Sequence, residues 1–532
     1  MPTSPDEPQR GNLATAAVLF VAVVAVYFAN GDFVLCGDAT ANLHIPLSLL
    51  AEGNLSFTPQ EYPFLFNWQL ETPQGVTDAT FTRWDDTLMG VPASVLYQTN
   101  RLVPQDSGYI AVPTTREGVY ASFFGVGAGL SFLPFACGLL LFSSAPAMSP
   151  ALYYLGKCAA TLFIAGSVVC VFLSARFFLT RRNALFLSIA YALGTSVWSV
   201  SSQTLWQHAP NTFFLTLGVY FLLKVPQAKR YAVYTALALG WAVWCRPTSA
   251  VVAASVGVYL LITDRKAFWP YPITGLPFAI GLAAYNTYYL GSPLRFGQTV
   301  TAPQLAMDKT GSPEVWQTPL FTGLAGLLFS PSRGLFLYSP VLIFAVWGGW
   351  RLWTSKRYIP LRPLFVAMLL VLCVEAKHFD WWGGFSFGYR HIVDLCPFLA
   401  LAIIPVMDTV IRRRRLLGVF VCLLAWSVAV QVVGAFAYNG VSWNGRPAIA
   451  VQVPDEPEPV YVFDDKEAEQ LAEAKGGEVL GLQMLNIDAP MFRHRLWSLC
   501  DSQLLYHFQH FREARALRKA RFETWLESPQ PW

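Results

Sequence analysis

Long apolar stretches separated by short polar breaks dominate the sequence. A helix needs about 20 mostly apolar residues to cross a bilayer. On that basis the pattern predicts about eleven crossings, at 13–30, 152–177, 183–200, 209–224, 230–245, 247–263, 268–290, 335–353, 362–377, 393–411 and 416–437. Basic clusters lie between them at 181–182, 224–230, 265–266, 356–362 and 412–415. Because short cytoplasmic loops are rich in lysine and arginine, the chain is predicted to start inside the cell and end outside.

One further apolar stretch, 119–142, does not fit this count. As a full crossing it would place the basic cluster 181–182 outside, so we predict a re-entrant or interfacial segment. Its glycines at 125, 127 and 129 allow other helices to approach closely. The prediction is an all-α polytopic membrane protein with a cytoplasmic N-terminus (1–12) and a transmembrane domain (13–438). That domain contains a long first extracytoplasmic loop (31–118), and a small extracytoplasmic C-terminal region (439–532) follows it.

The composition supports a membrane protein. Hydrophobic residues make up 54% of the 532 residues and charged residues 13%, against about 25% charged residues in ordinary soluble proteins. A net charge of +4 is too small to indicate a nucleic-acid partner. The nine cysteines show no CxxC or Cys/His clustering, which excludes a disulfide framework or zinc site as the main interpretation. Cys36 and Cys500 are both predicted to lie outside and could pair.

The predicted cytoplasmic loops are too short to hold much chemistry, so we expect the working site on the outer face. Asp38 follows the first span and lies in the first turn of a helix at the membrane surface, with Asn42 one turn later on the same face. A carboxylate at the lipid boundary is costly unless it has a partner or a role. The structural alternative is a helix N-cap.

The segment 378–394 combines glycines, aromatic residues, histidines, acids and one arginine. Arg390 is the candidate phosphate ligand, because a guanidinium binds a phosphate in bidentate fashion. Trp382, Tyr389 and His391 are candidate substrate contacts beside it. The alternative is an aromatic belt with an arginine reaching to the interface. Arg333 is a second phosphate candidate, with the helix N-terminus and an interfacial arginine as its alternative.

Two weaker candidates complete the set. His208 lies at the outer end of a predicted span, where a capped interface residue is the alternative; we include it as a substrate contact. Asp85 and Asp86 are the only hint of a metal. We therefore predict no metal ligands and no cofactor.

Several motifs occur in an order that resembles a known superfamily. They are Gly37-Asp38-Ala39 after the first span, the glycine-rich exit of the first outer loop, Cys245-Arg246-Pro247-Thr248, Tyr285-Asn286 with Gly291-Ser292-Pro293, and Gly388-Tyr389-Arg390-His391 ahead of Pro397. Over roughly 13–440 the chain resembles the GT-C superfamily of integral-membrane glycosyltransferases, which use polyprenyl-phosphate sugars. Protein O-mannosyltransferases and lipid A aminoarabinose transferases belong to it.

The resemblance implies a catalytic aspartate, which maps onto Asp38. The family often has a second acid directly after it, and here Ala39 follows. Arginines on the lipid phosphate map onto Arg390 or Arg333. The implied reaction moves a sugar, with inversion, from a polyprenyl-phosphate donor to a lipid, glycan or protein acceptor. It would take place at the extracytoplasmic face of the inner membrane, among membrane lipids.

Two other functions remain open. One is a polymerase or ligase acting on a lipid-linked polysaccharide, which would use the outer arginines but not Asp38. The other is a transporter that flips a lipid or glycan. The sequence shows no inverted repeat, and charges avoid the middle of the predicted spans, where transporters place their coupling groups.

Overall fold

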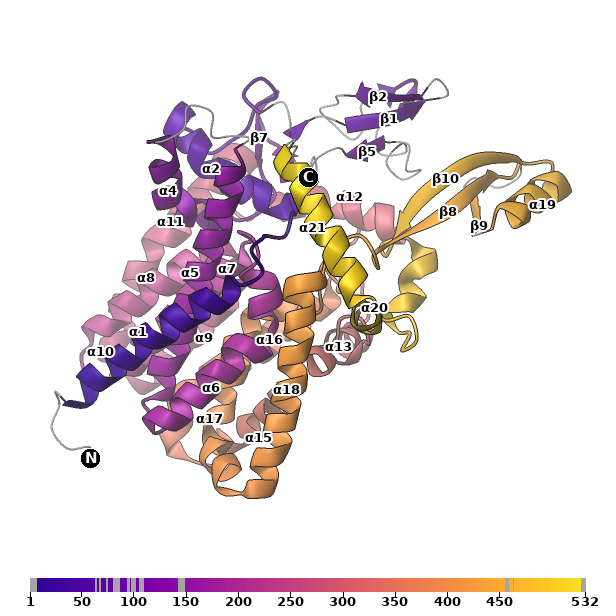
Figure 1. Cartoon of the computed structure of the whole chain (residues 1–532). Helices are drawn as coiled ribbons and strands as arrows, with labels where there is room; N and C mark the ends of the chain where they lie inside the picture. Colours follow the sequence, from indigo (N-terminus) through magenta and orange to yellow (C-terminus); the bar gives the residue numbers. More distant parts are fainter. Residues whose placement is uncertain are drawn as a thin grey trace.

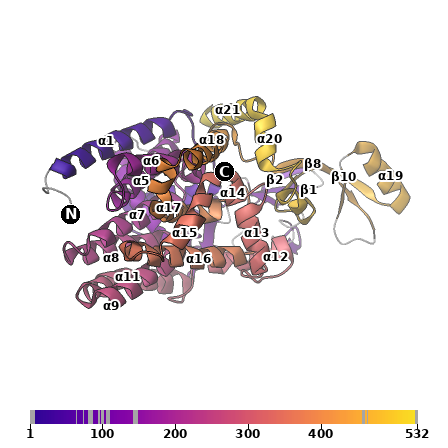
Figure 2. The same ribbon diagram turned by 90° about the horizontal axis from the view of Figure 1, so that it is seen from below.

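The computed structural model describes residues 7–62, 65–66, 68–72, 75–79, 87–92, 96, 102–104, 110–141, 149–454, 459–462 and 464–527. Most of these residues are helical, and the long helices pack side by side into one bundle (Figure 1). Its members are α1 (Glu7–Tyr27), α5 (Pro150–Ala175), α6 (Arg181–Gly194), α7 (His208–Lys224), α8 (Arg230–Cys245), α9 (Ala250–Thr263), α11 (Pro270–Leu290), α15 (Phe344–Arg351), α16 (Arg362–Lys377), α17 (Cys396–Arg412) and α18 (Arg414–Ala437). Seen from below, α1 and α9 lie on opposite sides of this bundle (Figure 2).

Within the described residues, four helical stretches are long and apolar enough to cross a membrane: Pro150–Ala175, Lys356–Lys377, Arg390–Arg412 and Arg414–Ala437. Shorter apolar helices accompany them, so the polytopic membrane character is supported while the count of about eleven stays a prediction. Some predicted spans are broken. The span 335–353 divides into α14 (Leu335–Tyr338), the 3-10 turn η5 (Pro340–Ile343) and α15, because Pro340 has no N–H to continue the helix.

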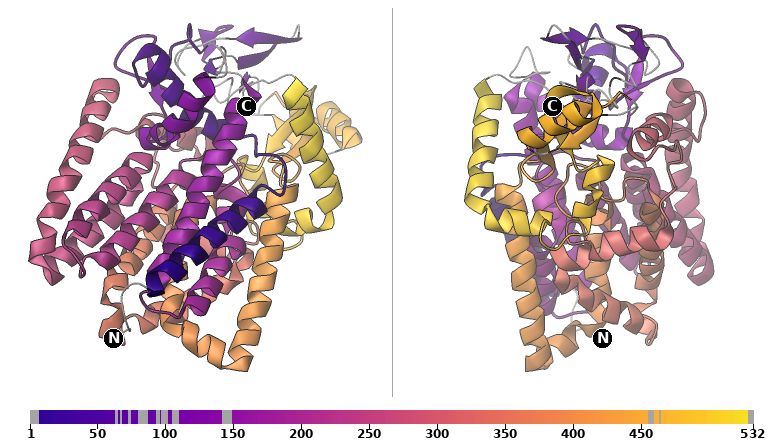
Figure 3. Two further views of the ribbon diagram at one scale, coloured as in Figure 1. Left: turned by 60° about the vertical axis from the view of Figure 1, so that its left-hand side comes forward. Right: turned by 90° about the vertical axis from the view of Figure 1, so that its right-hand side faces the viewer.

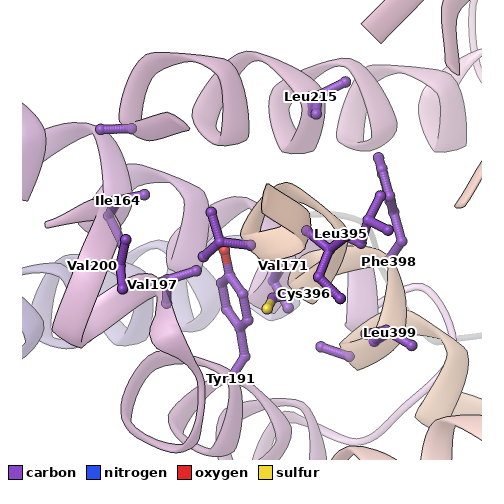
Figure 4. Packing of buried hydrophobic residues seen from close by; sticks show 14 of the residues in the cluster. Ile164, Val171, Tyr191, Val197, Val200, Leu215, Leu395, Cys396, Phe398 and Leu399 are labelled. Atoms are coloured by element: carbon purple, nitrogen blue, oxygen red, sulfur yellow. The ribbon is translucent and has the colours of Figure 1, made fainter. Parts of the chain in front are cut away.

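The packing of the bundle is apolar and tight. Figure 4 shows side chains from α5, α6, α7 and α17 meeting in one layer, together with the π-helical turn η3 (Val197–Ser201). Tyr191 is the largest of them and is buried, with its hydroxyl 2.6 Å from Ser167 Oγ. A buried hydroxyl without such a partner would cost stability, so the pair lets a polar group lie in this core.

The chain is mostly helical, as predicted, but it also contains short strands that the all-α prediction left out. The first loop contains a three-stranded antiparallel sheet of order β2-β1-β5, built from β1 (Trp68–Thr72), β2 (Gly75–Ala79) and β5 (Leu102–Pro104). Two short hairpins join it: β3 (Thr87–Leu88) with β4 (Val91–Pro92), and β6 (Ala111–Pro113) with β7 (Tyr120–Ser122). These strands are two to five residues long, too short for period-two alternation to distinguish them from loop in the sequence.

The C-terminal region also contains a sheet, of order β10-β8-β9, from β8 (Gly445–Gln452), β9 (Val460–Val462) and β10 (Glu478–Asn486). Ile449, Val451 and Val462 face α19 (Asp465–Lys475) and form a small core with Ala468. This unit projects away from the bundle (Figures 1 and 2). The chain then returns through η8 (Pro490–Leu496), α20 (Gln503–Gln509) and α21 (Phe511–Glu527), which lie against the bundle (Figure 3).

Helices α2 (Gly37–Glu52) and α4 (Val126–Leu140) lie at the upper end of the bundle in Figure 1, beneath the strands of the first loop. At 1.5 Å per residue, α4 is about 22 Å long, shorter than the roughly 30 Å of a bilayer core. Gly125 and Gly127 lie so close to the backbone of Trp244 and Cys245 that a Cβ there would overlap it. Of the three glycines predicted to allow close approach, Gly125 and Gly127 therefore face α8, whereas Gly129 faces Ile45 and Asn42 of α2.

The disulfide that Cys36 and Cys500 could form is not present in the structure. All nine cysteines are free thiols, with Cys36 half-buried and Cys500 exposed. Cys36 is the residue directly before α2, and Cys500 lies between η8 and α20 in the C-terminal region. Proximity across such distant segments is set by tertiary packing, which cysteine counting does not reveal.

Candidate functional site

A partly buried ion pair joins the two strongest candidates from the sequence. Asp38 Oδ2 lies 2.6 Å from Arg390 Nη2, and Asp38 is only 8% exposed. Asp38 is the second residue of α2, whereas the N-cap position is occupied by Cys36 in extended conformation. The N-cap alternative for Asp38 is therefore not what the structure shows. The carboxylate instead faces a guanidinium, which gives it the partner that a charge at a membrane boundary needs.

Arg390 comes from a different part of the chain. It is the first residue of the 3-10 turn η7 (Arg390–Leu395), which leads directly into α17. We call residues 378–389, which connect α16 to η7, the Arg390 loop. The Arg390 guanidinium lies 5.0 Å from the centre of the Trp206 ring. The planar cation is thus held between a carboxylate and an indole, an arrangement that arginine favours over lysine.

Asn42 stabilises the same corner from the helix side. Its amide Nδ2 donates to Leu205 O at 3.0 Å, which connects α2 to the segment just ahead of Trp206. Asn42 is 1% exposed. Asn42 therefore ties α2, which carries Asp38, to the segment that carries Trp206, and Arg390 lies between these two segments. A contact between Asn42 and a substrate stays a prediction.

A network of charged side chains surrounds η7, the turn that begins with Arg390. Arg246 Nη1 donates to Asp394 Oδ2 at 2.7 Å, and Arg246 Nη2 donates to Glu375 Oε1 at 2.8 Å. His208 Nδ1 lies 3.0 Å from the same Asp394 oxygen, and His391 Nδ1 lies 3.4 Å from Glu375 Oε2. Both predicted histidines thus belong to one network, which surrounds η7.

Sequence reasoning missed this network as a unit. Arg246, Glu375 and Asp394 each lie at the end of an apolar stretch, and each charge there requires a partner. That requirement was the available signal, since one cation and two acids at predicted span ends are complementary. Arg246 Nη1 also donates to His391 O at 3.0 Å. The network therefore fixes the backbone beside Arg390.

The remaining candidates hold the Arg390 loop. The Tyr389 hydroxyl accepts from Ser196 N at 3.0 Å and lies 2.6 Å from Ser339 Oγ. Trp382 Nε1 donates to Asp488 Oδ1 at 2.8 Å, so the loop also contacts the C-terminal region. Both aromatic side chains are buried. Their contact with a substrate stays a prediction.

Arg333 differs from Arg390 in its surroundings. It is fully buried, and its guanidinium donates to the carbonyl oxygens of Trp382 at 2.8 Å, Gly384 at 3.0 Å and Ser332 at 2.9 Å. Burial lowers the pKa of Arg333 from its ordinary value, although tyrosine hydroxyls nearby oppose the shift. These contacts make Arg333 a cross-link for the Arg390 loop.

A second charge cluster lies at the other end of that loop. Lys309, in α12 (Gly297–Thr310), has its Nζ 2.9 Å from Asp380 Oδ2 and 3.1 Å from Asp488 Oδ2. Burial opposes the charged form of Lys309, but the two carboxylates outweigh it and raise the lysine pKa. Among the described residues, no group of three or more histidine, cysteine or acidic side chains could hold a metal ion. Asp85 and Asp86 lie outside the described residues.

This chain is similar to a known protein family and to two solved structures. Residues 156–289 match the family model described as dolichyl-phosphate-mannose-protein mannosyltransferase. No curated protein sequence matches the chain significantly. Two solved structures are similar: ArnT from Cupriavidus metallidurans bound to undecaprenyl phosphate, and the oligosaccharyltransferase of Archaeoglobus fulgidus in the apo form.

The two structures are distant. ArnT is 16% identical, with 79% of this chain and 70% of ArnT covered and a TM-score of 0.40. The oligosaccharyltransferase is 12% identical, with 81% of this chain and 55% of that chain covered and a TM-score of 0.43. The family match over 156–289 confirms the resemblance to the GT-C glycosyltransferases, and the enzyme class that it indicates for this chain is a membrane glycosyltransferase.

Proposed function

We propose that this protein transfers a sugar from a polyprenyl-phosphate donor to an acceptor hydroxyl, with Asp38 as the general base and Arg390 as the cation on the leaving phosphate. The observation that carries the proposal is the partly buried ion pair between Asp38 and Arg390. In this pair a carboxylate at the start of α2 lies against a guanidinium at the start of η7, which supports the proposed roles of proton acceptor and phosphate ligand. Both groups are ones that the reaction requires.

The chemistry balances with these two residues. The acceptor oxygen attacks the anomeric carbon while its proton passes to the Asp38 carboxylate. The bond from the anomeric carbon to the phosphate oxygen breaks, and its electron pair stays on the phosphate. Arg390 stabilises the negative charge that develops there. Polyprenyl phosphate is released, and the sugar is inverted because attack and departure take place on opposite faces.

The geometry of the free enzyme adds a requirement. In inverting glycosidases the two catalytic carboxyl groups stand roughly 6.5–9.5 Å apart, which leaves room for the attacking nucleophile beside the sugar. The 2.6 Å contact between Asp38 and Arg390 leaves no such space. Donor binding must therefore separate the pair: the phosphate takes over Arg390, and the Asp38 carboxylate becomes available to the acceptor. The base is thus freed only when a donor is present.

An apolar groove is available for the prenyl chain of the donor. It has a volume of about 510 Å³ and runs between α1 and α6, from Ala14 and Leu185 to Val26 and Leu193. Leu193 is close in sequence to Ser196, whose N–H donates to Tyr389 beside Arg390. We assign the prenyl chain to this groove, with its phosphate end toward Arg390.

We place the reaction at the extracytoplasmic face of the inner membrane. The turn between α17 and α18 carries the basic cluster 412–415 and lies at the opposite end of the bundle from α2 (Figure 1). Basic clusters of this kind mark the cytoplasmic side. The acceptor is a lipid, glycan or protein hydroxyl. Arg390 supplies the positive charge that the leaving phosphate needs, so the proposal assigns no metal and no cofactor.

The Asp38→Asn variant tests the base. We expect it to lose about 10²- to 10⁴-fold in transfer rate, because the amide cannot accept the acceptor proton. Binding of the lipid carrier should persist. Asp32→Asn is the matched control, since Asp32 is a nearby acid that pairs with Arg518. Transfer would be measured from a radiolabelled polyprenyl-phosphate sugar in proteoliposomes. Normal transfer by Asp38→Asn would refute the base assignment and favour a polymerase or ligase, whereas absence of transfer by the wild-type protein would favour a flippase.

A further inference from the structure

One side chain of the C-terminal region, Gln503, binds the backbone of the Arg390 loop at two places close to Arg390. Gln503 is the first residue of α20 and is fully buried. Its Oε1 accepts from Gly388 N at 3.1 Å, and its Nε2 donates to Ser386 O at 2.9 Å. The same Oε1 accepts from the Tyr338 hydroxyl at 3.1 Å. Gln503 therefore contacts both the residue two places before Arg390 and the residue four places before it.

These contacts continue a regular pattern along the loop. Arg333 binds the carbonyl oxygens of Trp382 and Gly384, and Gln503 binds Ser386 and Gly388. Every second residue from 382 to 388 is thus held through its backbone. Arg390 is the next residue in this series. Its contact is made by the side chain, which pairs with Asp38.

Gln503 is itself held in place. Its backbone N–H donates to Ser332 Oγ at 3.1 Å, and the Ser332 hydroxyl donates to Arg495 O at 3.0 Å. Ser502 caps α20 by accepting from Leu505 N. The glutamine side chain therefore starts from a rigid base, as precise positioning of another residue requires.

We propose that Gln503 is a positioning residue for Arg390, and that the C-terminal region is a working part of the active site. The inference rests on the proposed function, because it takes Arg390 to be the phosphate ligand. It gives a role to a part of the chain that the family match at 156–289 does not reach. Without Gln503, Ser386 O and Gly388 N lose buried partners, and the backbone must move to find others. Arg390 would move with it.

The experiment compares Gln503→Met with Asn439→Ala. Methionine has a similar length but makes none of the three hydrogen bonds. Asn439 accepts from Val441 N and Ser442 N and donates to Ala514 O, so its side chain supports the C-terminal region through bonds within that region. The dissociation constant for undecaprenyl phosphate would be measured in nanodiscs, together with KM and kcat for transfer. We expect Gln503→Met to weaken carrier binding about tenfold or more, because misplacement of a ligand group by about 1 Å has effects of that size.

Each outcome bears on one claim. Weaker carrier binding and a raised KM in Gln503→Met, with unchanged binding in Asn439→Ala, support positioning. A folded Gln503→Met variant that binds the carrier like wild type overturns it. If Gln503→Met does not fold, Gln503→Glu decides in the same way, since it keeps the two accepted bonds and loses only the bond donated to Ser386 O. Arg390→Ala distinguishes the two proposals. Unchanged carrier binding in that variant would contradict the proposed function itself, and not only the role of Gln503.

Discussion

Two arginines that look equivalent in the sequence have different surroundings in the structure. Arg390 and Arg333 both lie where a loop enters an apolar helix, so position relative to the membrane could not distinguish them. The difference is in their partners. Arg333 donates hydrogen bonds to backbone carbonyls, whereas Arg390 faces a carboxylate and an indole. Such partners come from segments distant in sequence, which no local pattern contains.

Alanine variants of the two arginines should therefore fail in different ways. Arg390→Ala is expected to keep its fold and to raise the KM for the donor at least about tenfold, because a charge-assisted contact contributes roughly 1.5–3 kcal/mol. Arg333→Ala leaves several buried carbonyls without donors, at about 1–3 kcal/mol each, and should lower the melting temperature strongly. Thermal melts and transfer kinetics measured on both variants would check this. A well-folded Arg333→Ala variant with only a raised KM would restore Arg333 as a phosphate ligand.

At the scale of the element, the Arg390 loop is shaped by its glycines. Gly383, Gly384 and Gly388 have positive φ angles of 75°, 55° and 61°. An aromatic belt alone does not require glycines, and the structure shows that these glycines form backbone turns that other residues adopt at a cost. Which hydrogen bonds the turns would make could not be predicted. The partners come from Arg333 and Gln503, on either side of the loop in sequence.

Gly388→Ala tests the loop as a unit. A Cβ at position 388 would lie 2.7 Å from the Tyr338 ring, and the residue has φ +61°. We expect a loss of stability above the roughly 1–2 kcal/mol of a left-handed residue alone, together with weaker donor binding. Gly440→Ala is the control, because it has φ +79° and no atom within 4 Å of its Cβ. Equal effects of the two substitutions on carrier affinity and melting temperature would contradict a specific role for the loop.

At the scale of the whole molecule, the helix bundle followed from apolar length, but the C-terminal region did not. Residues 439–532 have no long apolar stretch, and the sequence predicted only a small cap or surface helix. In the structure, the last helix α21 is fixed to the start of the chain. Arg518 Nε donates to Asp32 Oδ2 at 2.9 Å, and Phe522 packs edge-on against Phe33. Ion pairs and ring contacts between segments this distant in sequence cannot be predicted from the hydrophobic pattern.

A buried histidine in the C-terminal region is expected to make the stability of the protein sensitive to acid. His507 of α20 is 1% exposed and packs against Phe387 of the Arg390 loop and against Tyr438. Burial, in spite of a bond to Gln503 O and with a further contribution from Arg333, lowers the pKa of His507 to about 4. Its ordinary value is about 6.5. Between these two values the unfolded chain binds more protons than the folded chain, so stability falls as the pH drops from about 6.5 to about 4.

His507→Phe should therefore flatten the decline of the melting temperature between pH 7 and pH 4.5, because an aromatic ring of similar shape has no proton to gain. The full effect of His507 is limited to about 3 kcal/mol, the value for a shift of two to three pKa units. His510→Gln is the control, since His510 is exposed and pairs with Glu513 at the surface. If the melting curves of His507→Phe and wild type decline in parallel, acid acts elsewhere. If they diverge below about pH 6.5, protonation of one histidine weakens the hold of the C-terminal region on the Arg390 loop.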